Sequence, residues 1–265
     1  MKMTRYKNSL VAFSFLVFTV IGVNAQDQDT DAVGGMVTDR PDATESPSVV
    51  PKGYLQVETG GFYESFEENN TTLERTVYNT SLLRYGVLEN LELRVGWNFE
   101  DQKITGQENS VSGLSPLLFG LKLAIAEEKN GWPEVGFIGH LFLPFTASTD
   151  FKPETTGADF RFSVSHTLSE NTNLSYNFGA QWGADSPEIA YIYTIAYGIG
   201  LSDKIGFYAE LYGDLPENSS ANHFWDTGFT WLMQPNIQFD ATVGTSITQG
   251  QDILLSAGLS FRIPG

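Results

Sequence analysis

The chain has 265 residues, carries 15 basic against 32 acidic side chains and contains no cysteine. The acidic balance argues against nucleic acid as a partner, because phosphate binding needs clustered Lys and Arg. The absence of cysteine excludes disulfides, thiol catalysis and zinc–thiolate sites. After residue 30 the sequence has no run of roughly 20 apolar residues, which a membrane helix needs. A soluble β protein and a membrane barrel both remain compatible with this composition, since a barrel hides its apolar character in alternation.

Residues 1–25 have the three parts of a secretory signal peptide. Lys2, Arg5 and Lys7 give a positive start, residues 10–23 are apolar, and a small-residue cleavage site follows. The apolar part has about 14 residues, which is short for a membrane span. An uncleaved anchor helix is the lesser alternative. We expect the peptide to be removed and the protein to leave the cytoplasm.

Residues 26–52 are polar and acidic and are interrupted by Pro41, Pro47 and Pro51. A segment of this composition is expected to lie in solvent, as a periplasmic leader ahead of the folded domain. One folded domain is therefore predicted over residues 53–265.

From residue 53 onward, apolar and polar residues alternate in about twelve stretches. In residues 91–99, for example, Leu91 and Leu93 fall on one face. Glu92 and Arg94 fall on the opposite face. Successive side chains of a strand point to opposite sides, so each stretch has one apolar face and one charged or small face. The predicted strands cover residues 54–66, 73–87, 91–99, 117–126, 134–145, 160–168, 174–182, 189–201, 205–212, 224–233, 237–244 and 253–263.

Short and long connections alternate between these strands. Short turns are predicted at residues 89–90, 127–131, 169–172, 202–204 and 234–236, and longer polar links at residues 100–113, 146–158 and 213–223. An up-and-down membrane barrel has short periplasmic turns and long outer loops. A secreted β-sandwich is the alternative, because its strands also alternate, but its connections need not alternate in length. The sequence favours an all-β, up-and-down antiparallel transmembrane β-barrel of about twelve strands in the bacterial outer membrane.

The face that would point into this barrel carries charges of both signs. The residues predicted to line the lumen are Arg84, Glu92, Arg94, Lys122, Arg161, Glu210, Asp226, Asp240 and Arg262, with Glu58 near the start of the domain. Such charges either pair across strands and fill a narrow barrel, or line a passage and set its selectivity. In an open passage, acidic loops would favour cations; their residues are Glu67, Glu68, Glu100, Asp101, Asp150, Glu154, Asp214 and Glu217.

Catalytic and metal sites have little support in the sequence. The three histidines are His140, His166 and His223. Ser165 adjoins His166, but neighbours on a strand point to opposite faces and cannot pair directly. His140 could meet Ser163 or Ser165 from an adjacent strand, although no spacing requires it. A lipid-modifying outer-membrane hydrolase is a minor alternative, and no catalytic residue, cofactor or metal is predicted.

Residues 38–60, TDRPDATESPSVVPKGYLQVETG, resemble the opening of a family of outer-membrane barrels named for the MetA pathway of phenol degradation. The resemblance continues in residues 82–97, LLRYGVLENLELRVGW, and more loosely in residues 196–213, AYGIGLSDKIGFYAELYG. It implies a barrel in the Gram-negative outer membrane that passes small, hydrophobic or aromatic molecules. It supplies no catalytic or ligand-binding residues.

The resulting prediction is a passive outer-membrane channel or transporter for small solutes, surrounded by outer-membrane lipid. The alternative is a closed structural or ligand-binding barrel whose lumen is filled by side chains and residues 26–52. The two hypotheses differ in whether the lumen conducts.

Overall fold

The computed structural model describes residues 35–68, 71–107, 109–185, 188–248 and 250–265. The predicted signal peptide and the first part of the predicted leader lie outside the described residues. The described part forms one antiparallel sheet of thirteen strands. They are β1 (Tyr54–Glu68), β2 (Thr71–Leu88), β3 (Leu91–Ile104), β4 (Val111–Leu114), β5 (Leu117–Ala126), β6 (Glu134–Leu143), β7 (Gly157–Ser169), β8 (Thr172–Trp182), β9 (Ile189–Gly200), β10 (Ile205–Pro216), β11 (Asn222–Gln234), β12 (Ile237–Ser246) and β13 (Gln251–Pro264).

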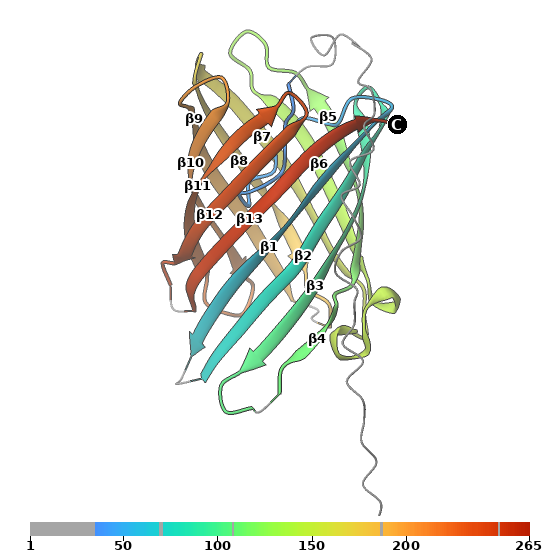
Figure 1. Ribbon diagram of the computed structural model, residues 1–265, viewed down its shortest axis with the longest axis vertical. Coiled ribbons are helices and arrows are strands. Elements are labelled where there is room, and N and C mark those ends of the chain that lie inside the picture. Colours follow the sequence, from blue (N-terminus) through green and yellow to red (C-terminus); the bar gives the residue numbers. More distant parts are fainter. Residues whose placement is uncertain (1–34, 69–70, 108, 186–187, 249) are drawn as a thin grey trace, which may run out of the picture. The chain divides into compact units, whose positions relative to one another are not determined.

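All of these strands except β4 form a closed ring (Figure 1). Neighbours in the ring follow the chain order, and the ring closes where β1 pairs with β13, with Tyr54 facing Pro264. The short strand β4 pairs with the end of β3, with Phe99 facing Leu114, and β3 continues the ring through β5. The predicted up-and-down barrel of about twelve strands is confirmed.

The outer face of the barrel is apolar and its interior is polar. Leu93, Phe119, Leu121 and Ile195 are exposed by 38 to 48%. The largest fully buried side chains are mostly polar or charged and include Arg84, Arg94, Lys122, Gln56, Glu58, Glu92, Asn177 and Asp240. A soluble β-sandwich buries its apolar faces, so this distribution is the inverse of that alternative. It matches a barrel that faces lipid.

Several strands extend beyond their predicted ends. β3 continues to Ile104 inside the predicted link 100–113, and β4 begins within the same link and ends at Leu114. β10 continues to Pro216 inside the predicted link 213–223. Hydrogen bonds of a strand ladder join backbone groups and need no apolar side chains, so pairing continues where the apolar alternation stops.

β6 ends earlier than predicted, at Leu143 rather than residue 145. Pro144 follows, and it lacks the N–H group that the ladder needs. The chain turns there into two 3-10 helices, η2 (Pro144–Thr146) and η3 (Thr149–Phe151). No helix in the described part of the chain is long and apolar enough to cross a membrane.

Candidate functional site

Residues 35–52, called the N-terminal segment below, run inside the barrel (Figure 1). The hydroxyl of Thr44 lies 2.7 Å from that of Thr194 on β9, and Thr44 is 4% exposed. At the other side of the lumen, the N–H of Val50 donates to Glu92 of β3 at 2.7 Å. The expectation of a solvated leader is therefore wrong for this part of the chain. The remainder of the predicted leader lies outside the described residues.

Two inward glycines make room for the N-terminal segment. A Cβ atom on Gly86 of β2 would lie 2.2 Å from the carbonyl oxygen of Pro51. One on Gly136 of β6 would lie 2.8 Å from the carbonyl oxygen of Pro47. Both distances are shorter than any ordinary carbon–oxygen contact, so a larger residue would have to move the segment. The shape of the wall is therefore matched to the segment that it holds.

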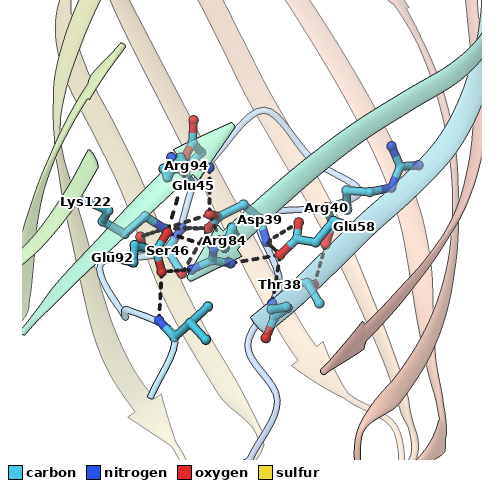
Figure 2. Close-up of polar contacts among 12 residues, drawn as sticks. Thr38, Asp39, Arg40, Glu45, Ser46, Glu58, Arg84, Glu92, Arg94 and Lys122 are labelled. Carbon is cyan, nitrogen blue, oxygen red and sulfur yellow. Dashed lines mark hydrogen bonds and ion pairs between the residues drawn. The ribbon is translucent and has the colours of Figure 1, made fainter. Parts of the chain in front are cut away.

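The carboxylate of Asp39 is the centre of a buried ion cluster (Figure 2). It lies 3.1 Å from Arg84 Nη1, 3.0 Å from Arg94 Nη2 and 2.7 Å from Lys122 Nζ. The three cations stand on β2, β3 and β5 and are exposed by at most 2%. We call these four residues the Asp39 cluster. Burial alone would raise the pKa of Asp39, but Arg84, Lys122 and Arg94 outweigh it and hold the pKa below its ordinary value.

Three glutamates complete the pairing around the Asp39 cluster. Arg84 binds Glu58 and Glu92, each at 2.8 Å, and both acids stand on the barrel wall. Glu45 of the N-terminal segment pairs with Arg94. Removing one partner of such a buried pair leaves an uncompensated charge, at a typical cost of about 3–5 kcal/mol.

The register of the sheet places like charges side by side in two places. Arg84 of β2 faces Arg94 of β3, and Glu210 of β10 faces Asp226 of β11. Like charges directly opposite one another destabilise a sheet. The N-terminal segment relieves the basic pair, because Asp39 contacts both of its guanidinium groups.

The acidic pair receives neutral donors from the N-terminal segment. Glu210 accepts hydrogen bonds from the N–H of Ala43, at 2.7 Å, and from the hydroxyl of Thr44. Asp226 has one buried oxygen without a hydrogen-bond partner among the described residues. Burial, together with the carboxylates of Glu210 and Asp226, raises the pKa of Asp42 well above its ordinary value. This side of the lumen is therefore acidic, and the N–H and O–H groups of the N-terminal segment satisfy Glu210.

The other residues that were predicted to line the lumen lie outside the Asp39 cluster and the acidic pair. Asp240 on β12 pairs with Arg40 of the N-terminal segment at 2.9 Å. Arg262 on β13 donates to the carbonyl oxygen of Gly35 at 3.4 Å. Arg161 on β7 lies 3.7 Å from the nearest carboxylate oxygen of the segment. The structure thus places all nine predicted residues on the inner face. It brings Arg84, Arg94 and Lys122 together in the Asp39 cluster, with Glu92 paired to Arg84. That the nine residues line a passage stays a prediction.

Sequence reasoning missed the residues of the N-terminal segment that meet these charges, above all Asp39, Arg40 and Glu45. The segment forms no strand or helix over residues 35–51, so alternation offers no signal for it. Asn177 of β8 was missed as well, although it binds the backbone of Glu45 through both amide atoms, each at 2.8 Å. The available signal was the unusual stretch of charges and prolines that precedes the first strand.

The histidines do not form a catalytic group with serine. Each lies within hydrogen-bond distance of another side chain. His140 lies 3.0 Å from Asp159 and His166 lies 3.3 Å from Tyr176, both across adjacent strands, and His223 of β11 lies 2.7 Å from Tyr193 of β9, across Gly213 of β10. The register sets Ser163 opposite Gly136, away from His140. The described residues also contain no group of three or more His, Asp or Glu side chains that could hold a metal ion.

A cavity of about 310 Å³ lies between the N-terminal segment and the wall formed by β8 to β12. Its lining includes Arg40, Asp42 and Thr44 from the segment and Tyr208 and Gln238 from the wall. The segment therefore leaves part of the lumen unfilled on this side.

Comparison with known proteins places these observations in a family. The fold is similar to an outer membrane channel from Pseudomonas putida F1, with a TM-score of 0.63 and 11% identity over 82% of this chain and 97% of that one. It is also similar to the NanC porin (TM-score 0.51, 12% identity, 79% and 100% covered) and to the translocator domain of the autotransporter NalP from Neisseria meningitidis (0.51, 10%, 88% and 92%). At these identities the likeness concerns the fold alone. Comparison with the curated proteins gives no match.

The family model described as "Putative MetA-pathway of phenol degradation" matches residues 38–263. The match begins inside the N-terminal segment and ends in β13, so it includes both the Asp39 cluster and the barrel that surrounds it. The chain therefore belongs to the family of the MetA pathway of phenol degradation.

Proposed function

We propose that this protein is a passive channel for small solutes in the bacterial outer membrane, and that its N-terminal segment closes the lumen. Solutes pass when the segment shifts away from the wall. The apolar outer face supports a position in lipid. The fold shared with an outer membrane channel and a porin supports a transport role.

The solute class to test first is small and aromatic. The description of the family refers to the degradation of phenol, which is a small aromatic compound. A cavity of about 310 Å³ beside the segment is large enough for a single ring compound, since ligand sites of this kind start at about 300 Å³.

One observation carries the closing role of the N-terminal segment. Over residues 35–51 the segment takes no part in the strand ladders, and its only bridge to the sheet within the described range joins Lys52 to Gly86. Its other polar contacts run through side chains or single backbone groups. The segment can therefore leave the wall without breaking a ladder of the barrel.

A reversible tether tests this proposal. The hydroxyl oxygens of Thr44 and Thr194 lie 2.7 Å apart, and a disulfide joins sulfurs about 2.05 Å apart, so the double variant Thr44→Cys/Thr194→Cys is suited to cross-linking. The natural chain has no cysteine that would compete. In planar lipid bilayers we expect the oxidised variant to be silent and the reduced variant to conduct, with Thr44→Cys alone as the control.

Equal conductance of the oxidised and reduced forms would show that the N-terminal segment is not the gate. Silence of both forms, and of the unmodified protein, would overturn the channel proposal. The closed barrel would then be the better description, and the buried, paired charges of the lumen are the observation that favours it.

A further inference from the structure

Two cations of the wall depend on the N-terminal segment for their close acidic partners. Lys122 Nζ lies 2.7 Å from both carboxylate oxygens of Asp39 and donates to the carbonyl oxygen of Ser46 at 2.8 Å. Arg94 pairs with Asp39 at 3.0 Å and with Glu45 (Figure 2). When the segment withdraws, both cations keep only wall partners.

The wall itself cannot replace these partners. Its nearest carboxylate to Arg94 is Glu92, at 3.7 Å from Nε, and both oxygens of Glu92 already accept hydrogen bonds from Arg84. Withdrawal leaves a cluster of positive charge without its anions, so the vacated wall favours an incoming anion.

The same wall holds donors that the chain does not use. Arg94 Nε, Arg161 Nε and Ser163 Oγ are buried and have no hydrogen-bond partner among the described residues. Arg161 reaches its two nearest carboxylate oxygens only at 3.7 and 3.8 Å. In the register, Lys122 and Arg161 stand on either side of Ile138 of β6, which places the cations and donors on one continuous stretch of wall.

We propose that Arg94, Lys122 and Arg161 form a binding site for the carboxylate of a small solute, which Asp39 and Glu45 occupy while the lumen is closed. This inference rests on the proposed withdrawal of the N-terminal segment. The two carboxylates already show the geometry that such a ligand would adopt at guanidinium and ammonium groups. A solute carboxylate restores one of the two negative charges that leave with Asp39 and Glu45, whereas a neutral or cationic solute restores none.

The site and the loops predict opposite selectivities, which makes the inference testable. Of the acidic residues predicted for loops, Asp150, Glu154 and Glu217 lie outside the strands and are exposed, and they predict a preference for cations at the mouth of the barrel. The cations Arg94, Lys122 and Arg161 predict that an anionic solute inside the lumen promotes withdrawal of the N-terminal segment. Benzoate, benzyl alcohol and benzylamine share a ring and differ in charge, so they separate the two effects.

The experiment uses the Thr44→Cys variant in lipid vesicles and follows labelling of the cysteine by a maleimide. We expect benzoate to accelerate labelling about 5- to 150-fold, the usual range of coupling between a ligand and a two-state element, and the other two compounds to leave it unchanged. With the additional substitution Lys122→Met, the cysteine should be labelled at the same rate with and without benzoate. The additional substitution Lys204→Met, in an exposed turn, should preserve the acceleration by benzoate.

A second variant, Arg161→Gln, should reduce the ratio of labelling rates with and without benzoate. It tests the same site if Lys122→Met does not fold. Equal acceleration by benzoate and benzyl alcohol would overturn the carboxylate site while leaving the tether experiment in favour of a channel. Failure of the tether experiment would remove the proposed function itself, so the two outcomes are distinguishable.

Discussion

The interior of this barrel has two walls of opposite charge. The inner faces of β2, β3, β5 and β7 carry cations, namely Arg84, Arg94, Lys122 and Arg161, and we call them the basic wall. The inner faces of β10, β11 and β12 carry acids, namely Glu210, Asp226 and Asp240, and we call them the acidic wall. The N-terminal segment lies between the walls and contacts both.

The two walls hold the N-terminal segment by different means. At the basic wall, the segment offers the full charges of Asp39 and Glu45 to buried cations. At the acidic wall it offers one cation, Arg40, and otherwise N–H and O–H donors. A hydrogen bond to a charged group contributes less to stability than is lost when the central charge of a buried ion cluster is removed. We therefore expect the basic wall to dominate.

The largest effect is expected from Asp39→Asn. This substitution leaves three buried cations without their shared carboxylate and should weaken docking of the N-terminal segment by about 3–5 kcal/mol. In the Thr44→Cys background, the cysteine should react with a maleimide about two to four orders of magnitude faster. The control is Asp203→Asn, which removes an acid from an exposed turn. An unchanged rate in Asp39→Asn would show that the basic wall does not hold the segment.

A smaller effect is expected from Arg40→Gln, at the acidic wall. It deprives the fully buried carboxylate of Asp240 of its cation but leaves an amide that can still donate to it. The loss should be about 1.5–3 kcal/mol, the value for a hydrogen bond to a charged group. The same labelling assay measures it. An effect as large as that of Asp39→Asn would mean that the two walls contribute equally.

The smallest effect is expected from Gly136→Ala, which changes shape without changing charge. Its Cβ would meet the carbonyl oxygen of Pro47 at 2.8 Å and should cost about 1–3 kcal/mol of docking free energy, as overpacking usually does. Gly139→Ala on the same strand is the matched control, since its Cβ would make only an ordinary 3.6 Å contact with Phe137. Similar labelling of the two variants would leave charge as the sole determinant of docking.

The sequence was sufficient to predict the strands and the face of the sheet on which their charged side chains lie. The alternation at residues 117–126 gives β5 with its observed ends, and the same alternation turns Lys122 inward. A period of two assigns a face to a residue without any knowledge of its partner. It fails at residues 100–104, where a polar chain continues β3 through backbone pairing.

The partners of the inward charges could not be predicted in this way. Asp39 and Glu45 lie in a segment without periodicity, and nothing local to it indicates which wall it meets. Arg40 and Asp240 are 200 positions apart in the chain. Such contacts depend on the closed ring, which brings β12 beside the N-terminal segment. The sequence supports a lumen filled by charges, but only the structure shows that they pair through the N-terminal segment.

The contacts of Arg40 have a consequence for assembly. This residue binds Asp240 on β12 and Ser256 on β13, 200 and 216 positions further along the chain. Contacts of such separation form only after nearly all of the chain is in place. The strands that complete the ring thus dock on the part of the folded chain that is made first, so that sealing the seam and filling the lumen are one event. β13 therefore both closes the ring against β1 and holds Arg40 inside the lumen, so that the closed seam and the filled lumen depend on the same strand.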